Sequence, residues 1–348
     1  MNLEIRNAGA RGISFILPVT LHEKRNLVDG GLSWRHAPDD CCRLRVQLMI
    51  ASFLRFFSQE DLCEFKIVCP EYQMEVIKGM LRSLTTDYRY QVVSETELIG
   101  ALSVGRASEP NAGTLPVSGW IVQQIIKIAA AAQLHSEHYV TLDSDIICLK
   151  HFSFGDLIEG GRAWTNIETR SDYDRLYIDS FSEAEYQLKS QRCQCSALAL
   201  GYTRSAAMES VFYGETPVVF HTASMIALSS HITKRFKRPW IEALAGRDCL
   251  KGWTEISLYF LFLEMTGQLD SLCVRADCNR VLDLEKSVWH ESRYYREARV
   301  YDQRHFMEDS PKRGPFVAVQ SWLPTRSWLP KRCDKLSEFY AELKGMLL

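Results

Sequence analysis

The segment that could most directly do chemistry is Asp143-Ser144-Asp145, which follows the apolar run from His138 to Leu142. That run predicts a strand, and two carboxylates at i and i+2 at the end of a strand project to the same side. Carboxylate oxygens are the ligands that Mg²⁺ and Mn²⁺ prefer, and a cation held there would neutralise a diphosphate leaving group. Asp143 and Asp145 are therefore predicted metal ligands, with a solvated turn or a helix cap as the structural alternative.

A helix is predicted directly before this strand, from Trp120 to about Gln133. It is apolar nearly all round, so it should be buried, and its few polar positions become informative. Trp120, Gln124 and Lys127 lie at i, i+4 and i+7 and share one face. If Lys127 has no role in a site, it would be a lysine whose aliphatic stem is buried at the rim of the helix. Without such a role, Trp120 would be a core aromatic.

Strands and helices alternate in the first half of the chain, which favours a parallel α/β sheet covered on both sides. In such sheets ligands bind at the carboxyl ends of the strands, where the two aspartates are expected. The strands are predicted at 13–19, 65–69, 90–93 and 138–142, with helices at 41–57 and 72–84 and a loop at 109–119. Beyond residue 150 we expect strands at 162–167, 196–202 and 315–320 and helices at 222–232, 254–266 and 333–346.

The composition is that of an ordinary globular protein. The 348 residues carry a net charge of -2, and 46% are hydrophobic, which argues against a disordered chain and against a general polyanion binder. No apolar run reaches the ~18 residues of a bilayer span, and the N-terminus lacks the apolar core of a signal peptide, so we expect a cytoplasmic protein. The eleven cysteines have no disulfide-framework spacing and are expected to be reduced thiols.

Three features together resemble a glycosyltransferase of the GT-A fold. They are the strand ending in D-x-D, the buried helix before it, and a first strand ending in Pro18-Val19-Thr20. The chain is also similar to a largely uncharacterised bacterial family predicted to have this fold and activity. That similarity runs from residue 13 to about 323, through a Gly-Trp-x-x-Gln-Gln-x-x-Lys segment (119–127), a Thr-Glu-x-x-Leu-Tyr segment (254–259) and Gln-Ser (320–321). The insertion between Thr20 and Asp39 departs from the pattern.

The resemblance implies a Rossmann-like mixed sheet flanked by helices in a single domain, 1–348. Residues 13–150 would bind the nucleotide-sugar, 151–323 would face the acceptor, and 324–348 would form a C-terminal helix. Asp143 and Asp145 would hold Mn²⁺ or Mg²⁺, with a third ligand from a C-terminal histidine, for which His290 is the candidate. A packed histidine beside Trp289 is the alternative for His290.

The resemblance also implies a donor pocket. Ser144 would lie near the ribose, and Lys127 would be a point charge near phosphates or a sugar hydroxyl. The remaining residues assigned to this pocket are Thr20, Trp120 and Gln124. From position alone, Asn166 and Glu168, just after the run Arg162-Ala163-Trp164, could touch the donor sugar or the acceptor.

Glu255 is the candidate general base. An inverting enzyme needs a carboxylate on the far side of the sugar to deprotonate the acceptor hydroxyl, and Glu255 opens a predicted helix. The structural alternative is equally simple, because Thr254 would be an N-cap and an acidic residue in the first turn interacts favourably with the helix dipole. A retaining enzyme would need no such base, so the stereochemical outcome stays open.

The predicted function is therefore metal-dependent transfer of a sugar from a UDP- or GDP-sugar to a glycan or lipid-linked glycan hydroxyl, in bacterial surface polysaccharide or lipopolysaccharide assembly. The basic segment Lys234–Trp240, and similarly Arg326–Arg332, could contact an anionic membrane, although charge runs also form solvated faces. A nucleotidyltransferase using the same aspartates and a non-catalytic sugar-binding scaffold are the alternatives. Nucleic-acid binding is not expected, because no recognition motif appears.

Overall fold

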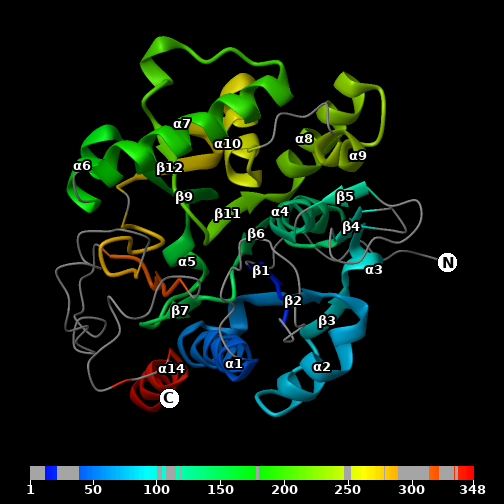
Figure 1. Cartoon of the computed structure of the whole chain (residues 1–348), viewed down its shortest axis with the longest axis vertical. Helices are drawn as coiled ribbons and strands as arrows, with labels where there is room; N and C mark the ends of the chain where they lie inside the picture. Colours follow the sequence, from blue (N-terminus) through cyan, green and yellow to red (C-terminus); the bar gives the residue numbers. More distant parts are fainter. Residues whose placement is uncertain are drawn as a thin grey trace, which may run out of the picture.

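A five-stranded sheet forms the centre of the computed structural model (Figure 1), with the strand order β11-β6-β1-β2-β3. The structure describes residues 12–21, 39–99, 104–106, 115–117, 119–177, 180–246, 252–277, 279–288, 313–320, 333 and 336–348. In the sheet β1, β2, β3 and β6 run parallel, and β11 pairs with β6 in the antiparallel direction. The bounds are β1 Ile13–Pro18, β2 Leu62–Cys69, β3 Tyr90–Ser94, β6 His138–Thr141 and β11 Val218–His221. The predicted α/β class, a mixed sheet flanked by helices, is confirmed.

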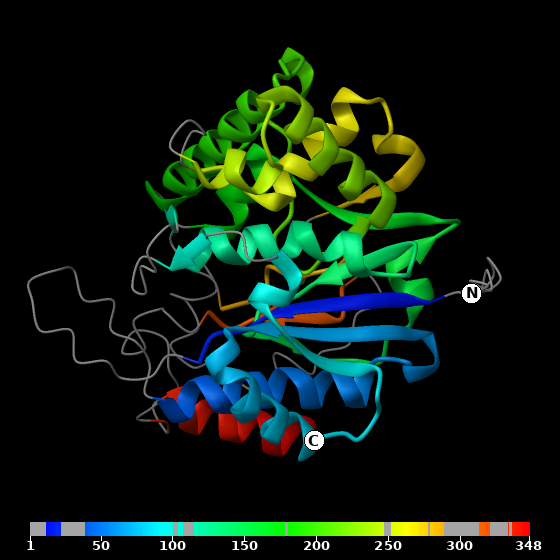
Figure 2. The ribbon, with the colours of Figure 1, turned by 90° about the vertical axis from the view of Figure 1, so that its right-hand side faces the viewer.

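Helices cover both faces of this sheet (Figure 2). On one side α1 (Asp39–Phe56) packs under the strands and α14 (Leu336–Leu347) packs against α1; on the other lies α4 (Gly119–Ala129). All of β1 is buried, as expected of a strand covered on two sides, and its side chains alternate between two apolar cores. Phe15 and Leu17 belong to the core under α1, whereas Ile16 belongs to the core with α4.

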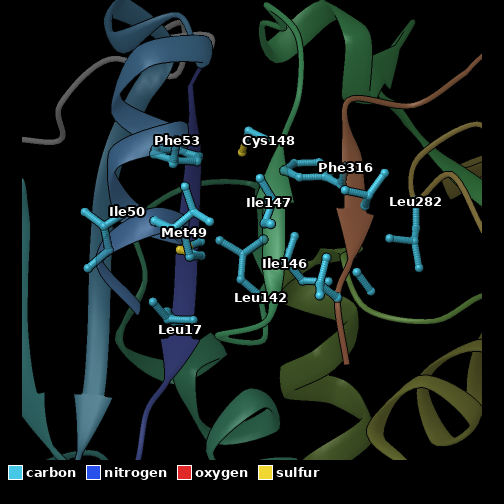
Figure 3. Close-up of a cluster of buried hydrophobic side chains, with 14 of the residues drawn as sticks. Leu17, Met49, Ile50, Phe53, Leu142, Ile146, Ile147, Cys148, Leu282 and Phe316 are labelled. Atoms are coloured by element: carbon cyan, nitrogen blue, oxygen red, sulfur yellow. The ribbon is translucent and has the colours of Figure 1, made fainter. Parts of the chain in front are cut away.

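The residues directly before and directly after the D-x-D in the sequence are buried (Figure 3). Leu142 before it and Ile146 and Ile147 after it are at most 2% exposed and belong to the same core as Leu17 and Met49. Ile146 begins β7 (Ile146–Cys148), which pairs antiparallel with β13 (Phe316–Ala318). The short acidic segment is therefore fixed at both ends by apolar packing.

A second helical layer lies beyond α4 in the same direction from the sheet (Figure 2). It contains α7 (Ser180–Leu200), α8 (Thr222–Phe236) and α10 (Glu255–Met265), and α10 is buried from Glu255 to Leu263. Beside it a smaller sheet has the order β10-β9-β12, with bounds β9 Arg162–Glu168, β10 Phe212–Tyr213 and β12 Cys273–Ala276, and β8 (Ile158–Glu159) pairs with β9.

The strand predicted at 196–202 is wrong, because these residues are the last turn of α7 and the turn after it. The run is short and apolar, and such a run is compatible with both helical and strand periodicity. Packing of α7 against α10 favours the helix. Cys193, Ala197 and Leu200, at helical spacing, are at most 8% exposed, whereas Leu198 between them is 57% exposed.

The other elements agree with the predicted segments or are short. The prediction of a loop at 109–119 is wrong in part, since Leu115–Val117 form β5, which pairs with β4 (Val104–Arg106), and Gly119 opens α4. The remaining helices are α2 Met74–Arg82, α3 Glu95–Ile99, α5 Phe154–Leu157, α6 Arg170–Leu176, α9 Trp240–Ala245, α11 Leu269–Leu272, and the 3₁₀ turns Gln59–Asp61, Glu71–Gln73, Ala130–Gln133 and Ala206–Met208.

The cysteines in the described ranges are free thiols, as expected. Within the same ranges, none of the helices combines the length and apolar character that crossing a bilayer requires.

Candidate active site

The D-x-D lies at the point where the order of the strands reverses. The chain adds β2 and then β3 on one side of β1, and later places β6 on its other side, in parallel register with Ile16 opposite Thr141. The carboxyl ends of β1 and β6 are therefore neighbours, and the amide of Leu142 donates to the carbonyl of Ile16 at 2.8 Å. In open α/β sheets ligands bind in the crevice at this switch point.

Backbone hydrogen bonds hold the acidic turn in place. The amide of Ile146 donates to the carbonyl of Asp143 at 3.1 Å, and the amide of Val319 donates to the carbonyl of Asp145 at 2.8 Å. The Asp143 side chain is 40% exposed, and that of Ser144 is half-buried. Burial and the nearby negative charge of Asp143 raise the pKa of Asp145 to about 6. The two carboxylates are thus close enough to repel each other.

Lys127 is the centre of the site. Its side chain is 2% exposed, and its ammonium group lies 2.9 Å from Oδ1 of Asp143 and 3.1 Å from Oε1 of Glu255. The Nζ also donates to the hydroxyl of Thr216 at 3.1 Å. Burial alone would lower the pKa of Lys127, but the two carboxylates raise it above its ordinary value, so the lysine is charged. It is not a lysine at the helix rim.

Glu255 lies on the buried side of Lys127. It is 1% exposed, and burial raises its pKa against the opposing effect of Lys127. Its amide donates to Oε1 of Gln124 at 3.3 Å, which links α10 to α4. Thr254 is the N-cap of α10, and its hydroxyl accepts the Ser257 amide at 3.0 Å. Thr254 therefore caps α10, as the structural alternative for this segment expects, and Glu255 in addition forms the ion pair with Lys127.

The three residues that were predicted to share one face of α4 differ in exposure. Gln124 and Lys127 are buried next to Glu255, whereas Trp120 is 40% exposed and is not a core aromatic. The guanidinium of Arg192, on α7, lies 5.7 Å from the centre of the Trp120 ring. Thr20 follows β1 at the neighbouring strand end, where the flanking Val19 and Leu21 are hydrogen-bonded to β2 and to Gln73.

A second buried charge cluster adjoins the first through Thr216 and its neighbour Glu215. Lys189 forms ion pairs with Glu215 and, at 3.3 Å, with Glu168, and Glu168 also accepts a hydrogen bond from Tyr173. Burial raises the pKa of Glu168. Asn166 has a different task, since its side chain bonds the backbone of Leu282 and Val281 at 3.0 and 2.8 Å. These bonds fix the backbone of the segment 281–282; contact of Asn166 with the donor sugar or the acceptor stays a prediction.

Sequence reasoning did not find Thr216, which has no pattern around it, or Arg45. Arg45 lies three residues after Cys42 and four before Met49, both buried, so it interrupts an apolar stripe of the helix. A charged residue at such a position could have indicated a functional role. The charge of Arg45 opposes the rise in the pKa of Asp145. Of the predicted residues, His290, Ser321 and Arg326–Arg332 lie outside the described ranges. Inside those ranges no three His, Cys, Asp or Glu side chains are arranged to hold a metal ion.

The chain belongs to the family of unknown function DUF6492, whose model matches residues 10–344. No curated protein matches it in sequence. Among solved structures it is similar to mouse xyloside xylosyltransferase 1 in its apo form, with 12% identity over 90% of this chain and 99% of that one and a TM-score of 0.44. It is also similar to the galactosyltransferase LgtC in complex with donor and acceptor sugar analogues, with 11% identity over 96% of each chain and a TM-score of 0.38.

A third similar structure is 4-diphosphocytidyl-2C-methyl-D-erythritol synthase from Anaerococcus prevotii. The identity is 14% over 66% of this chain and 84% of that one, with a TM-score of 0.31.

Proposed function

We propose that this protein is a glycosyltransferase that moves a sugar from a nucleotide-diphospho-sugar to a hydroxyl acceptor, with the help of a divalent cation. The observation that carries the proposal is the position of Asp143 and Asp145, at the carboxyl end of β6 and at the switch point next to β1. A nucleotide bound in that crevice would have its diphosphate beside the two carboxylates. The reaction then needs charge neutralisation at the leaving group, which is what such a site can supply.

The donor set suits Mg²⁺ or Mn²⁺. Both ligands are carboxylates, the oxygen type that these hard cations select. Burial and Asp143 raise the pKa of Asp145, so a second negative charge beside Asp143 is unfavourable, and a bound cation would offset that cost. When bound, the cation would act as a Lewis acid on the diphosphate. His290 stays a proposed third ligand.

Lys127 is assigned the task of orienting Asp143. Because Lys127 is buried and held by Glu255 and Thr216, its ammonium group can fix one carboxylate oxygen of Asp143 and leave the exposed part of that side chain free for a ligand. The Asp143 side chain is 40% exposed and that of Lys127 is 2% exposed, so Asp143, and not Lys127, is the group that a ligand can contact directly.

Glu255 was predicted to be the general base, and that remains a prediction. Its 1% exposure and its ion pair with Lys127 support a positioning role instead, because a base must reach the acceptor hydroxyl. Ser144, Thr20 and Trp120 stay assigned to the donor pocket. Of these, Trp120 has the best support, since an exposed ring beside Arg192 offers a flat face to a base or a sugar.

The proposed donor is a UDP- or GDP-sugar and the proposed acceptor a glycan or a lipid-linked glycan. The proposed setting is bacterial surface polysaccharide or lipopolysaccharide assembly, on the cytoplasmic side of the membrane. The exposed basic residues of the segment Lys234–Trp240 support contact with an anionic surface.

Product analysis tests the reaction class. The protein is incubated with nucleotide-sugars and Mn²⁺, and separately with nucleoside triphosphates, sugar phosphates and Mn²⁺. Release of a nucleoside diphosphate from one donor, lost in Asp145→Asn and kept in Asp270→Asn, is the expected result; Asp270 is a matched control because its side chain is 79% exposed and distant in sequence. Release of pyrophosphate instead would make the protein a nucleotidyltransferase. Sugar binding that is indifferent to Asp145→Asn, without turnover, would make it a scaffold.

A further inference from the structure

An apolar groove of about 490 Å³ lies between α3, α8, α9 and the end of α4. These helices lie together in Figure 1, and α8 contacts both α9 and the 3₁₀ turn that continues α4. The floor of the groove is apolar, with Ile128, Leu98 and Ile241 among its residues. Its volume is within the range of pockets that bind small organic ligands.

The rim of the groove differs from its floor. Lys234, on α8, brings one positive charge to it, and Trp240 of α9 also lines the groove. The hydroxyl groups of Ser229, Ser230 and Thr233 donate hydrogen bonds to backbone carbonyls of their own helix. Among the residues that the structure describes, none that lines the groove is acidic. Ile226, 43% exposed, is an apolar residue that the fold leaves accessible on this wall.

Basic residues continue from the rim around the end of α8. Lys234, Arg235 and Lys237 are all exposed, and Lys237 ends the helix in the left-handed conformation, with φ at 54°. Arg235 donates a hydrogen bond to the carbonyl of Leu198, so it faces α7, whereas Lys234 lies on the groove. An apolar slot therefore opens beside a cluster of positive charge.

We propose that this groove binds an anionic phospholipid of a membrane surface. An acyl chain would lie on the apolar floor, and the phosphate of the head group would pair with Lys234 and Lys237. The argument is chemical complementarity: a long apolar chain joined to a negative head matches an apolar slot with a basic rim. A soluble acidic partner would match the charges and leave the floor of the groove unfilled. The inference rests on the membrane contact proposed above for the segment Lys234–Trp240 and names its ligand; it does not depend on the transfer reaction.

Vesicle flotation with the full chain tests the proposal. Vesicles of phosphatidylcholine are compared with vesicles in which part of it is replaced by phosphatidylglycerol, and binding to the anionic vesicles alone is expected. Lys234→Gln combined with Lys237→Asn should weaken binding about 25-fold, because each basic residue near an anionic surface contributes about fivefold. Asn is used at position 237 because it tolerates the left-handed conformation. Ile226→Ser should weaken binding about fivefold, since part of the lost side chain would no longer enter the apolar phase.

Two control variants separate this groove from general charge and general apolar surface. Lys78→Gln combined with Arg82→Gln removes the same charge from exposed positions on α2, and Leu198→Ser removes an apolar side chain that is 57% exposed on α7. Both should bind as the unchanged protein does. Failure to bind phosphatidylglycerol vesicles, or equal losses in the groove variants and the controls, would overturn the proposal. Release of nucleoside diphosphate from a donor in solution is measured on the same samples and reports separately on the transfer reaction.

Discussion

The ammonium group of Lys127 lies 2.9 Å from Oδ1 of Asp143, although the lysine is almost fully buried and the aspartate is 40% exposed. The pair therefore spans the boundary between the core and the proposed ligand crevice. Asp143 and Glu255, the latter 3.1 Å from the same ammonium group and equally buried, supply the charges that keep Lys127 ionised inside the protein. The buried ion pair of Lys127 and Glu255 fixes the core side of the site, and Asp143 leaves its other side exposed to solvent.

Replacement of Lys127 should destabilise the protein strongly. Lys127→Met leaves the buried Glu255 carboxylate without a countercharge, which costs about 3 to 5 kcal/mol in the free energy of unfolding. Adding Glu255→Gln should recover part of this loss. Urea unfolding measures both, with Lys78→Met as the control because the exposed Lys78–Glu75 pair should contribute less than about 1 kcal/mol. Equal losses for the two lysine variants would contradict the account.

Glu255→Gln separates the two roles of this residue. As a positioning residue, Glu255 acts through Lys127, so the variant should lose less than about tenfold in kcat/KM and keep the pH profile of the unchanged protein. A general base would behave differently, with a loss of about 10²–10⁴-fold in kcat and disappearance of the acid limb of the profile. Steady-state kinetics over a pH series decides between them.

The buried His138 should make the fold acid-labile. His138 is 1% exposed, neither ring nitrogen has a hydrogen-bond partner within the described ranges, and its pKa is lowered to about 4 by burial and by His221, whose ring is 5.3 Å away. The unfolded chain, with a pKa of about 6.5 at this residue, binds the proton more readily. The stability is therefore fully present above pH ~6.5 and should fall by about 3 kcal/mol as the pH falls to ~4.

Denaturant unfolding at several pH values measures this slope. His138→Gln should flatten it, while His135→Gln, at an exposed position, should not change it. A slope between pH ~6.5 and ~4 that is the same in all three proteins would show that His138 does not carry the effect.

The sequence alone predicts the parts of the site that lie close together along the chain. The D-x-D follows an apolar strand, and the helix before it has its polar residues on one face, so Asp143, Asp145, Gln124 and Lys127 could be singled out. Their assignment to one site came from the resemblance to GT-A glycosyltransferases. The first strand, with its continuous apolar run, could be placed in a sheet covered on both sides. These features depend on local periodicity, which a single sequence displays directly.

Glu255 and Thr216, the two partners of Lys127 that lie far from it along the chain, could not be predicted. Gln124, on the same helix as Lys127, is separated from Glu255 by 131 residues, and Thr216 is separated from Lys127 by 89. No periodicity relates such positions. The packing of α10 on α4 brings Glu255 to Lys127, whereas Thr216 comes from the segment between β10 and β11. The misassigned run at 196–202 has the same origin, since contact with α10 selects the helix there over a strand.

The most direct test of the central claim, that Asp143 and Asp145 hold a cation for a nucleotide-diphospho-sugar, is thermal unfolding with UDP-, GDP-, CMP- and dTDP-linked donors, each with Mn²⁺ and with EDTA. A donor at ~100 times its Kd should stabilise the protein by about 2.7 kcal/mol. The account predicts a rise in Tm with one diphosphate donor that needs Mn²⁺, disappears in Asp145→Asn and persists in Asp270→Asn. A rise that is the same with EDTA, or that survives Asp145→Asn, would contradict it.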